Sequence, residues 1–335
     1  MTPQPTPVRA FAHITARTLC SLAALLALAV PPAALAQAAY PVRPVRMIVA
    51  FPPGQATDLI ARLVADELSK AWAQPVIVEN RAGGDSIPGT MAGRSAPADG
   101  YTITFGTSSS FAVNPAVKSK LPYDPPKDFA MVYGMFSVPW IIVAHPGSPY
   151  ATLRDVVAAA KEAPGKVQWG YGSTSLQLGA ELFKLRSGAP LGGVAYKGSG
   201  PATTDLIGGH VPLLIDTVAA TLPHIRAGRM RPLATLADKR VPLLPDVPTV
   251  AEAGVPGAEA EGWGGIAVPR GTPADVIERI GAEVARIVND PAIQKRMLEL
   301  GIVPEPRGSK AWSAFVESEV AKWGDVARRA NVKED

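Results

Sequence analysis

The chain has 335 residues, and its 33 Lys and Arg against 29 Asp and Glu give a formal net charge of +4. Hydrophobic residues make up 47% and charged residues 19% of the sequence, a globular composition that excludes a disordered tail protein. A chain of this length can bury a large core and usually divides into two domains. The single Cys excludes an intrachain disulfide and a zinc site built from several cysteines.

Residues 1–36 have the pattern of a secretory signal peptide. Arg9 and Arg17 carry the only charges before residue 43, an apolar run covers residues 19–30, and Ala-Leu-Ala at 34–36 forms an A-x-A cleavage site. The apolar run is too short for a membrane anchor. Cleavage after residue 36 would leave 299 of the 335 residues, with no Cys and a net charge of +2. That product suits an oxidising compartment, and its charge offers no footprint for nucleic acid.

A strand–helix–strand unit is predicted over residues 45–79. Residues 45–51 form a buried-strand pattern that Pro52-Pro53-Gly54 ends, and a helix with Thr57 as a plausible N-cap follows. A second strand at 75–79 completes a βαβ unit with a parallel pair of strands. A further short strand at 101–106 is again followed by a polar loop.

The same alternation recurs between residues 140 and 236, before a mostly helical C-terminal part. Strands are predicted at 140–144, 166–170, 194–197, 213–217 and 232–236, and helices at 153–161, from 176 to about 185, and at 201–207. The later helices are predicted to start at Thr272-Pro273, Asp290-Pro291 and Ser309.

These two clusters of βαβ units favour an α/β fold with two domains, each built on a mixed sheet. Polar Gly, Ser and Thr loops follow the strand C-termini in both clusters. Ligands bind at that edge of open α/β sheets. We therefore expect a cleft between two facing sheet edges.

Local enzyme motifs are absent from the sequence: it contains no G-x-S-x-G, H-E-x-x-H, phosphate-binding G-x-x-x-x-G-K-[ST] or S-x-x-K pattern. His145, His210 and His224 lie beside Pro or Gly turns without helical spacing, which favours loop or surface histidines. Asp58, Asp85 and Asp216 are isolated carboxylates and give no sign of a catalytic pair. We therefore expect no catalytic residue, no cofactor and no metal.

Anion binding is the chemistry that the polar loops can perform. A turn that opens onto a helix N-terminus presents unpaired N–H groups and the positive end of the helix dipole. The hydroxyls of Thr57, Ser173, Thr174 and Ser175 can add hydrogen bonds. Any single loop is better explained as a helix cap or turn, but several such loops in a secreted protein favour a binding cleft.

Short motifs along residues 40–335 carry a family resemblance. They are Tyr40-Pro41, residues 45–49 and 51–58, Val78-Glu79-Asn80-Arg81, Ala98-Asp99-Gly100-Tyr101, Leu121-Pro122-Tyr123-Asp124-Pro125, Tyr196-Lys197-Gly198, Leu222-Pro223-His224-Ile225, Pro245-Asp246-Val247-Pro248-Thr249 and Ala321-Lys322-Trp323. In this order they resemble the Bug-type receptors, which are the periplasmic substrate-binding proteins of tripartite tricarboxylate transporters. Each motif alone is weak, whereas the colinear series is specific.

The resemblance implies a two-lobed periplasmic-binding-protein fold, the Venus flytrap of type II, with two crossover strands near 138–144 and 259–268. It places residues 40–140 plus 265–335 in domain I and residues 141–264 in domain II. It also implies a monomeric, non-enzymatic receptor. Such a receptor captures a small organic acid, held by loop N–H groups, hydroxyls and water, and delivers it to integral membrane transporter subunits.

The resemblance also implies the ligand-binding residues. In the first domain they are Pro53, Gly54, Gln55, Ala56, Thr57 and Asp58, with Ser108, Ser109 and Ser110 on the same side. In the second domain they are Ser173, Thr174, Ser175, Gln177, Lys197, Gly198, Asp216 and Thr217. Thr57 is the expected carboxylate donor. Asp58 either caps the helix or meets a donor on the ligand, and Lys197 is either a charge partner or a solvated lysine.

One departure from the family pattern lies in the first-domain loop, where Gln55-Ala56 replace the usual glycines. Glycine accepts positive φ and lets a ligand approach the backbone closely. We therefore expect either a narrowed pocket or a Gln55 amide that contacts the ligand. Two alternatives remain open at this point, a ligand-sensing domain for a signalling partner and a secreted enzyme that has reused the cleft.

Overall fold

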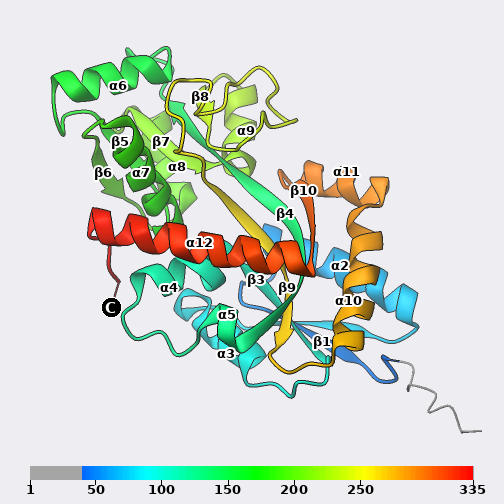
Figure 1. The fold of residues 1–335 in the computed structure, drawn as a ribbon. Coiled ribbons are helices and arrows are strands. Elements are labelled where there is room, and N and C mark those ends of the chain that lie inside the picture. Colours follow the sequence, from blue (N-terminus) through cyan, green and yellow to red (C-terminus); the bar gives the residue numbers. More distant parts are fainter. Residues whose placement is uncertain (1–39, 335) are drawn as a thin grey trace, which may run out of the picture. The chain divides into compact units, whose positions relative to one another are not determined.

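Ten strands form one mixed sheet within residues 40–334, the part of the chain that the computed structural model describes (Figure 1). They are β1 (Val45–Val49), β2 (Val76–Asn80), β3 (Thr102–Thr107), β4 (Phe129–Ala144), β5 (Gln168–Tyr171), β6 (Gly192–Ala195), β7 (Leu213–Thr217), β8 (Arg231–Thr235), β9 (Glu261–Pro269) and β10 (Val303–Gly308). Their order is β2-β1-β3-β9-β4-β7-β5-β6, and β8 and β10 also pair with β4. The predicted signal peptide lies outside the described residues.

The long strand β4 divides this sheet into two parts. Residues 129–139 of β4 pair with β9, whereas residues 140–144 pair with β7. We call the part built on β1, β2, β3, β9, β10 and residues 129–139 the first lobe, and the part built on β5 to β8 and residues 140–144 the second lobe. Parallel pairs occur within each lobe. In the first lobe β1 pairs with β2 and with β3, and in the second lobe β5 pairs with β6 and with β7. β9 pairs antiparallel with both β3 and β4.

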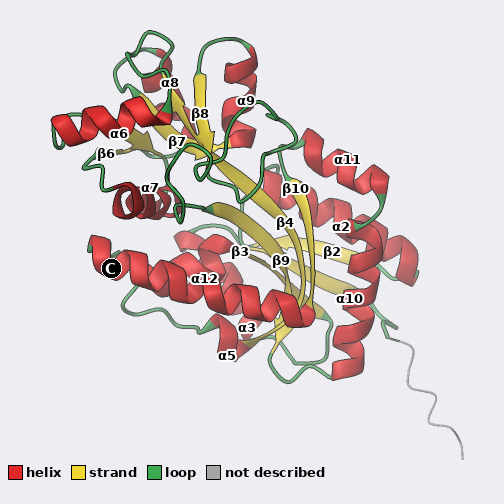
Figure 2. Cartoon of the chain, turned by 45° about the horizontal axis from the view of Figure 1, so that its top comes forward, coloured by secondary structure: helices red, strands yellow, loops and turns green. Residues whose placement is uncertain are grey.

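Two strands connect the lobes. β4 carries the chain from the first lobe to the second, and β9 carries it back after a segment that stays with the second lobe (Figure 2). In that segment Leu236 N–H donates to Trp140 O at 2.8 Å, and Ala260 N–H donates to Leu236 O at 2.8 Å. The fold is thus the two-lobed α/β fold with two crossover strands that the resemblance implied.

Helices cover both faces of the sheet. They are α2 (Ala56–Trp72), α3 (Ile87–Arg94), α4 (Asn114–Val117), α5 (Pro125–Asp128), α6 (Leu153–Glu162), α7 (Thr174–Ser187), α8 (Ser199–Ile207), α9 (Val218–Arg226), α10 (Ala274–Val288), α11 (Pro291–Glu299) and α12 (Ser309–Ala330), with a 3₁₀ turn η1 (Gly84–Ser86) and a π-helix η2 (Ser109–Val113). α12 packs along β4, α4 and η2 and also contacts α7 (Figure 2). Within residues 40–334, none of the helices combines the length and apolarity that crossing a membrane requires.

The second half of β4 is apolar throughout because both of its faces are buried. Successive side chains of a strand point to opposite faces. Ile142 therefore packs in a core cluster with Trp169 and Phe183, whereas Ile141 packs in a second cluster with Leu206 of α8 and Leu222 of α9.

The predicted helix starts had mixed outcomes. Asp290 caps α11 as predicted, since its carboxylate accepts Ala292 N–H at 2.7 Å. The predicted cap at Thr57 is wrong: α2 starts at Ala56 with Gln55 as the N-cap residue. The predicted cap at Thr272 is also wrong, because its hydroxyl donates to Pro269 O at 2.8 Å, and Pro273 precedes α10.

Candidate functional site

A cavity of about 220 Å³ lies between the two lobes. Its polar lining comes from the ends of strands and the starts of helices in both lobes, at the sheet edges where the sequence predicted a cleft. The polar lining residues are Thr57, Thr107, Ser108 and Ser109 from the first lobe and Ser173, Ser175, Ser199, Asp216 and Thr217 from the second. Seven of these nine were candidate ligand-binding residues from the sequence, and Thr107 and Ser199 were not.

The first-lobe loop before α2 is organised by Asp58, which is 1% exposed. Its carboxylate accepts Gly54 N–H at 2.8 Å, Arg62 Nε at 2.9 Å and Asn80 Nδ2 at 2.7 Å. Burial raises the pKa of Asp58, but the hydrogen bonds from Arg62, Gly54 and Asn80 outweigh it and leave the pKa below its usual value. Asp58 thus holds the loop with donors from the protein, although α2 has no side-chain cap hydrogen bond at Gln55.

The replaced glycines lie in the same loop. Gly54 has φ +84°, whereas Gln55 has φ −75°, an extended conformation that any residue adopts. Gln55 and Ala56 are exposed and do not line the cavity. The loop therefore keeps one glycine at the position of positive φ and tolerates side chains at the next two positions.

The serines after β3 have different contacts. Ser110 accepts Thr107 N–H at 3.1 Å and is buried inside the first lobe, away from the cavity lining. Ser109 Oγ lies 3.2 Å from Ser175 Oγ, a hydrogen bond that joins the two lobes across the cavity. Ser108 and Ser109 therefore line the cavity, while Ser110 shapes the turn behind them.

Two helix N-termini of the second lobe open at the cavity. Ser173 caps α7 by accepting Leu176 N–H at 3.3 Å, and Thr217 caps α9 by accepting Ala220 N–H at 3.2 Å. Both capping residues line the cavity. N–H groups and the positive end of a helix dipole favour a bound anion at such positions.

Asp216 lines the cavity at the end of β7 and is 0% exposed. Its Oδ1 accepts Ser199 Oγ–H at 2.8 Å and Thr217 N–H at 2.7 Å. Its Oδ2 is buried and has no hydrogen-bond partner within residues 40–334. Burial raises the pKa of Asp216 above its usual value, although the bonds from Ser199 and Thr217 act in the opposite direction.

Apolar side chains, four of them from the crossover strands, form the rest of the wall. They are Phe51, Phe136, Val138, Trp140, Leu176 and Trp263, next to Gly262. Trp263 is fixed because its Nε1–H donates to the buried Glu319 of α12 at 2.8 Å. The sequence analysis missed these residues, since apolar and aromatic residues in a strand have the same pattern whether they face a core or a cavity.

The remaining candidates lie outside this cavity lining. They are Pro53, Gly54, Gln55, Ala56, Asp58, Ser110, Thr174, Gln177, Lys197 and Gly198. Thr174 lines an adjacent cavity of about 190 Å³ together with Glu334. There the Thr174 hydroxyl donates to the Glu334 carboxylate, and Lys118 lies 3.4 Å from the same group. The Thr174 hydroxyl and the Glu334 carboxylate of the adjacent cavity are therefore already paired.

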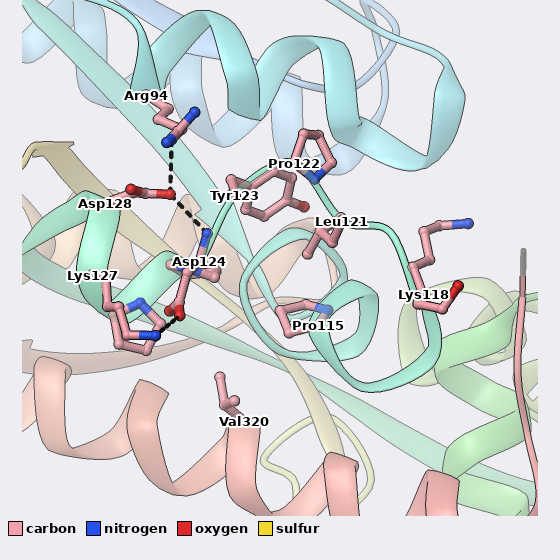
Figure 3. Close-up of a pocket in the computed structure, with 13 residues that line it drawn as sticks. Arg94, Pro115, Lys118, Leu121, Pro122, Tyr123, Asp124, Lys127, Asp128 and Val320 are labelled. Carbon is pink, nitrogen blue, oxygen red and sulfur yellow. Dashed lines mark hydrogen bonds and ion pairs between the residues drawn. The ribbon is translucent and has the colours of Figure 1, made fainter.

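A larger cavity, of about 630 Å³, lies in the first lobe around the Leu121–Pro125 motif (Figure 3). Four of its charged groups are paired with one another: Arg94 Nε contacts Asp128 at 2.8 Å, and Lys127 contacts Asp124 at 2.5 Å. These ion pairs are exposed to solvent. The smaller cavity between the lobes is the candidate site, because its helix N-termini and the unpaired Asp216 oxygen are available to a ligand.

Cations and metal clusters do not contribute to the site. Among the described residues that line the cavity between the lobes, none is Lys, Arg or His. Nor does the part of the chain that the structure describes bring three or more His, Cys, Asp or Glu side chains together as metal ligands.

Comparisons with known proteins agree with this fold. Residues 60–332 match the family described as "Tripartite tricarboxylate transporter family receptor". The protein BugT of Bordetella pertussis is 36% identical over 297 residues, which cover 88% of this chain and 91% of BugT. An R. palustris protein solved with adipate is 34% identical, with a TM-score of 0.75 over 88% of this chain and 99% of that one. MatC from Rhodopseudomonas palustris, solved with malate, is 29% identical, with a TM-score of 0.71 over 86% and 99% of the two chains.

Proposed function

Because the chain belongs to the tripartite tricarboxylate transporter receptor family, a family of solute-binding receptors, we propose that it binds a small carboxylate in the cavity between its lobes. It then delivers this acid to the integral membrane subunits of a tripartite transporter. Relatives solved with adipate and malate support a carboxylate as the ligand. The observation that carries the proposal is the pair of helix N-termini, at Ser173 and Thr217, that open into one cavity.

Thr57 and Ser173 are the proposed carboxylate donors, one from each lobe. A ligand held by both stabilises the arrangement in which the lobes meet, since a ligand shifts an equilibrium toward the state that it binds better. We propose that the lobes, divided near residues 140 and 264, close about β4 and β9. Ser109 and Ser175, whose hydroxyls already meet at 3.2 Å, lie on the two surfaces that this movement brings together.

The remaining parts of the proposal follow from the family. The protein acts as a monomer in the periplasm, reaches it through the signal peptide predicted at residues 1–36, and performs no chemical step on its ligand. The absence of Lys, Arg and His from the described lining favours capture over catalysis, because no general base other than Asp216 faces the cavity.

Thermal-shift screening of organic acids, followed by calorimetry, tests the function. At least one small acid should raise the melting temperature, and the double variant Thr57→Ala with Ser173→Ala should lose that binding while remaining folded. Because Ser173 also caps α7, the matched control is Thr152→Ala, which removes the cap of α6. Unchanged affinity in the double variant would contradict the site, and no stabilisation by any acid would contradict the function.

A further inference from the structure

Two buried polar atoms in the wall of the cavity lack partners within residues 40–334. They are Thr107 Oγ1 in the first lobe and Asp216 Oδ2 in the second. Almost all buried polar groups in proteins are hydrogen-bonded, and an unsatisfied one costs free energy. Two such atoms in the wall of one binding cavity indicate where a ligand supplies the missing hydrogen bonds.

The two atoms require different ligand groups. Thr107 Oγ1 belongs to a hydroxyl, which can donate to a carboxylate oxygen. Asp216 presents a carboxylate oxygen, which accepts, so it needs an O–H or N–H group from the ligand. Its other oxygen is already fixed by Ser199 and Thr217 N–H at 2.8 and 2.7 Å, which prevents the side chain from turning away.

The charge of the lining limits the ligand further. Asp216 is the one acid in the described lining, and no Lys, Arg or His accompanies it there. A ligand with two carboxylates would place its second negative charge near Asp216 in a site of low dielectric. Such like charges repel strongly when buried, so the lining favours a ligand with one carboxylate.

The remaining surface is apolar. Phe136, Trp140 and Trp263 are among the apolar side chains of the lining. The volume of about 220 Å³ is below that of sites for drug-sized ligands, which take about 300 Å³ or more. The body of the ligand is therefore short and largely apolar.

We propose that the ligand is a compact, largely apolar monocarboxylate whose opposite end carries a hydroxyl or N–H group that donates to Asp216 Oδ2. The carboxylate lies toward Thr57, Thr107 and the α7 N-terminus. This inference rests on the proposed function and narrows its substrate class, because it makes Asp216 the residue that discriminates between hydroxy acids and diacids.

Two size-matched triads of acids test the inference by calorimetry at pH 8. One triad is hexanoate, 6-hydroxyhexanoate and adipate, and the other is benzoate, 4-hydroxybenzoate and terephthalate. In at least one triad the hydroxy acid should bind the wild-type protein about tenfold or more tightly than both companions, because a hydrogen bond to a charged group contributes about that much.

Asp216→Asn provides the decisive variant. Thr217 N–H can only donate, so the Asn oxygen takes the place of Oδ1 and the Asn Nδ2 replaces Oδ2. The cavity then presents a donor, and the diacid should bind the variant about tenfold more tightly than it binds wild type. Asp205→Asn is the matched control, since Asp205 accepts Tyr196 Oη–H in the same lobe and does not line the cavity.

The outcomes separate the two proposals. If acids bind but the diacid equals or exceeds the hydroxy acid in wild type, or if Asp216→Asn leaves the preference unchanged, the inference about Asp216 is wrong and the receptor function stands. If none of the six acids binds the wild type or either variant, the inference is wrong, and the proposed carboxylate receptor fails with it when the thermal-shift screen of organic acids also finds no binder.

Discussion

Asp58 and Asp216 are both buried aspartates near the sheet edges that face the cavity, yet their carboxylates have different surroundings. The Asp58 carboxylate accepts three hydrogen bonds from Gly54, Arg62 and Asn80. The Asp216 carboxylate uses only one oxygen, and the other faces no donor among residues 40–334. The two aspartates are thus equally buried but differ in the count of satisfied oxygens, and this difference supports the binding role proposed for Asp216.

This difference in hydrogen bonding shifts the pKa values of Asp58 and Asp216 in opposite directions. Asp58 has a pKa below the usual value and Asp216 a pKa above it. A group that favours its charged form is stabilising at neutral pH, and a group whose charged form is disfavoured is destabilising there. Substituting the two aspartates should therefore change the free energy of unfolding with opposite signs.

The largest effect is expected for Asp58→Ala. The substitution leaves Gly54 N–H, Arg62 and Asn80 without their shared acceptor, and we expect a loss of about 2–4 kcal/mol in the free energy of unfolding at pH 7. Denaturant unfolding measures this loss. The control is Asp66→Ala on the exposed face of the same helix, with a change of about 0.5 kcal/mol or less. Equal effects of the two variants would contradict a structural role for Asp58.

Gly172→Ala should disturb the surroundings of Asp216. A Cβ at Gly172 would lie 2.5 Å from Gly198 C and 2.7 Å from Ser199 N, so the turn that carries Ser199 must move. We expect a destabilisation of about 1–3 kcal/mol, with weaker ligand binding because Ser199 donates to Asp216.

Gly200→Ala is the matched control for this glycine, because nothing lies within 4 Å of its added Cβ. It should leave stability unchanged or raise it slightly, since Ala is the better helix former. Wild-type affinity in Gly172→Ala would show that the position of Ser199 is irrelevant to the site.

Asp216→Asn should stabilise the ligand-free protein. The pKa of Asp216 is raised in the folded state, so the stability that this group contributes is complete below about pH 4 and is lost as pH rises through the folded pKa. Asn does not titrate, so the free energy of unfolding of the variant should exceed that of the wild type by about 0.5–2 kcal/mol at pH 7, and this gain should vanish near pH 3.

For Asp58→Asn the difference in the free energy of unfolding at pH 7 has the opposite sign and also shrinks at low pH, because the Asp58 pKa is lowered. Urea unfolding from pH 3 to pH 8 measures both curves, and parallel curves would contradict the contrast.

The smallest effect is expected for Glu334→Gln. The Glu334 carboxylate lies beside the site but is paired with Thr174 and Lys118, and it is partly exposed. We expect a stability change of about 1 kcal/mol or less and no change in the preference among the six acids. A changed preference would show that the adjacent cavity belongs to the binding site.

The sequence predicted more of the fold than of the cavity wall. The strands at 45–51 and 213–217 have clear hydrophobic patterns, and the cap at Asp290 has a local signal, so these features could be predicted. The first half of β4 was not predicted, because Phe129–Pro139 contains Gly134 and Pro139 and gains its order from pairing with β9 and β10. Tertiary pairing of this kind leaves no local pattern in the sequence.

At the site, seven of the polar lining residues were predicted, because they lie in loops after strands and match the family resemblance. The hydrogen bonds that each of these side chains makes could not be predicted. Thr57 was expected to cap its helix, but Asp58 bonds the loop N–H group instead, and Thr57 lines the cavity. Ser199 has no distinctive pattern, and only the structure shows that it donates to Asp216.

The most direct test of the account is a crystal structure of the protein with 6-hydroxyhexanoate or 4-hydroxybenzoate, whichever binds more tightly. The account predicts the ligand in the cavity between the lobes, with its carboxylate within hydrogen-bond distance of Thr57, Thr107 or Ser173 and its hydroxyl donating to Asp216 Oδ2. A ligand bound outside this cavity, or one that leaves Asp216 Oδ2 without a donor, would contradict it.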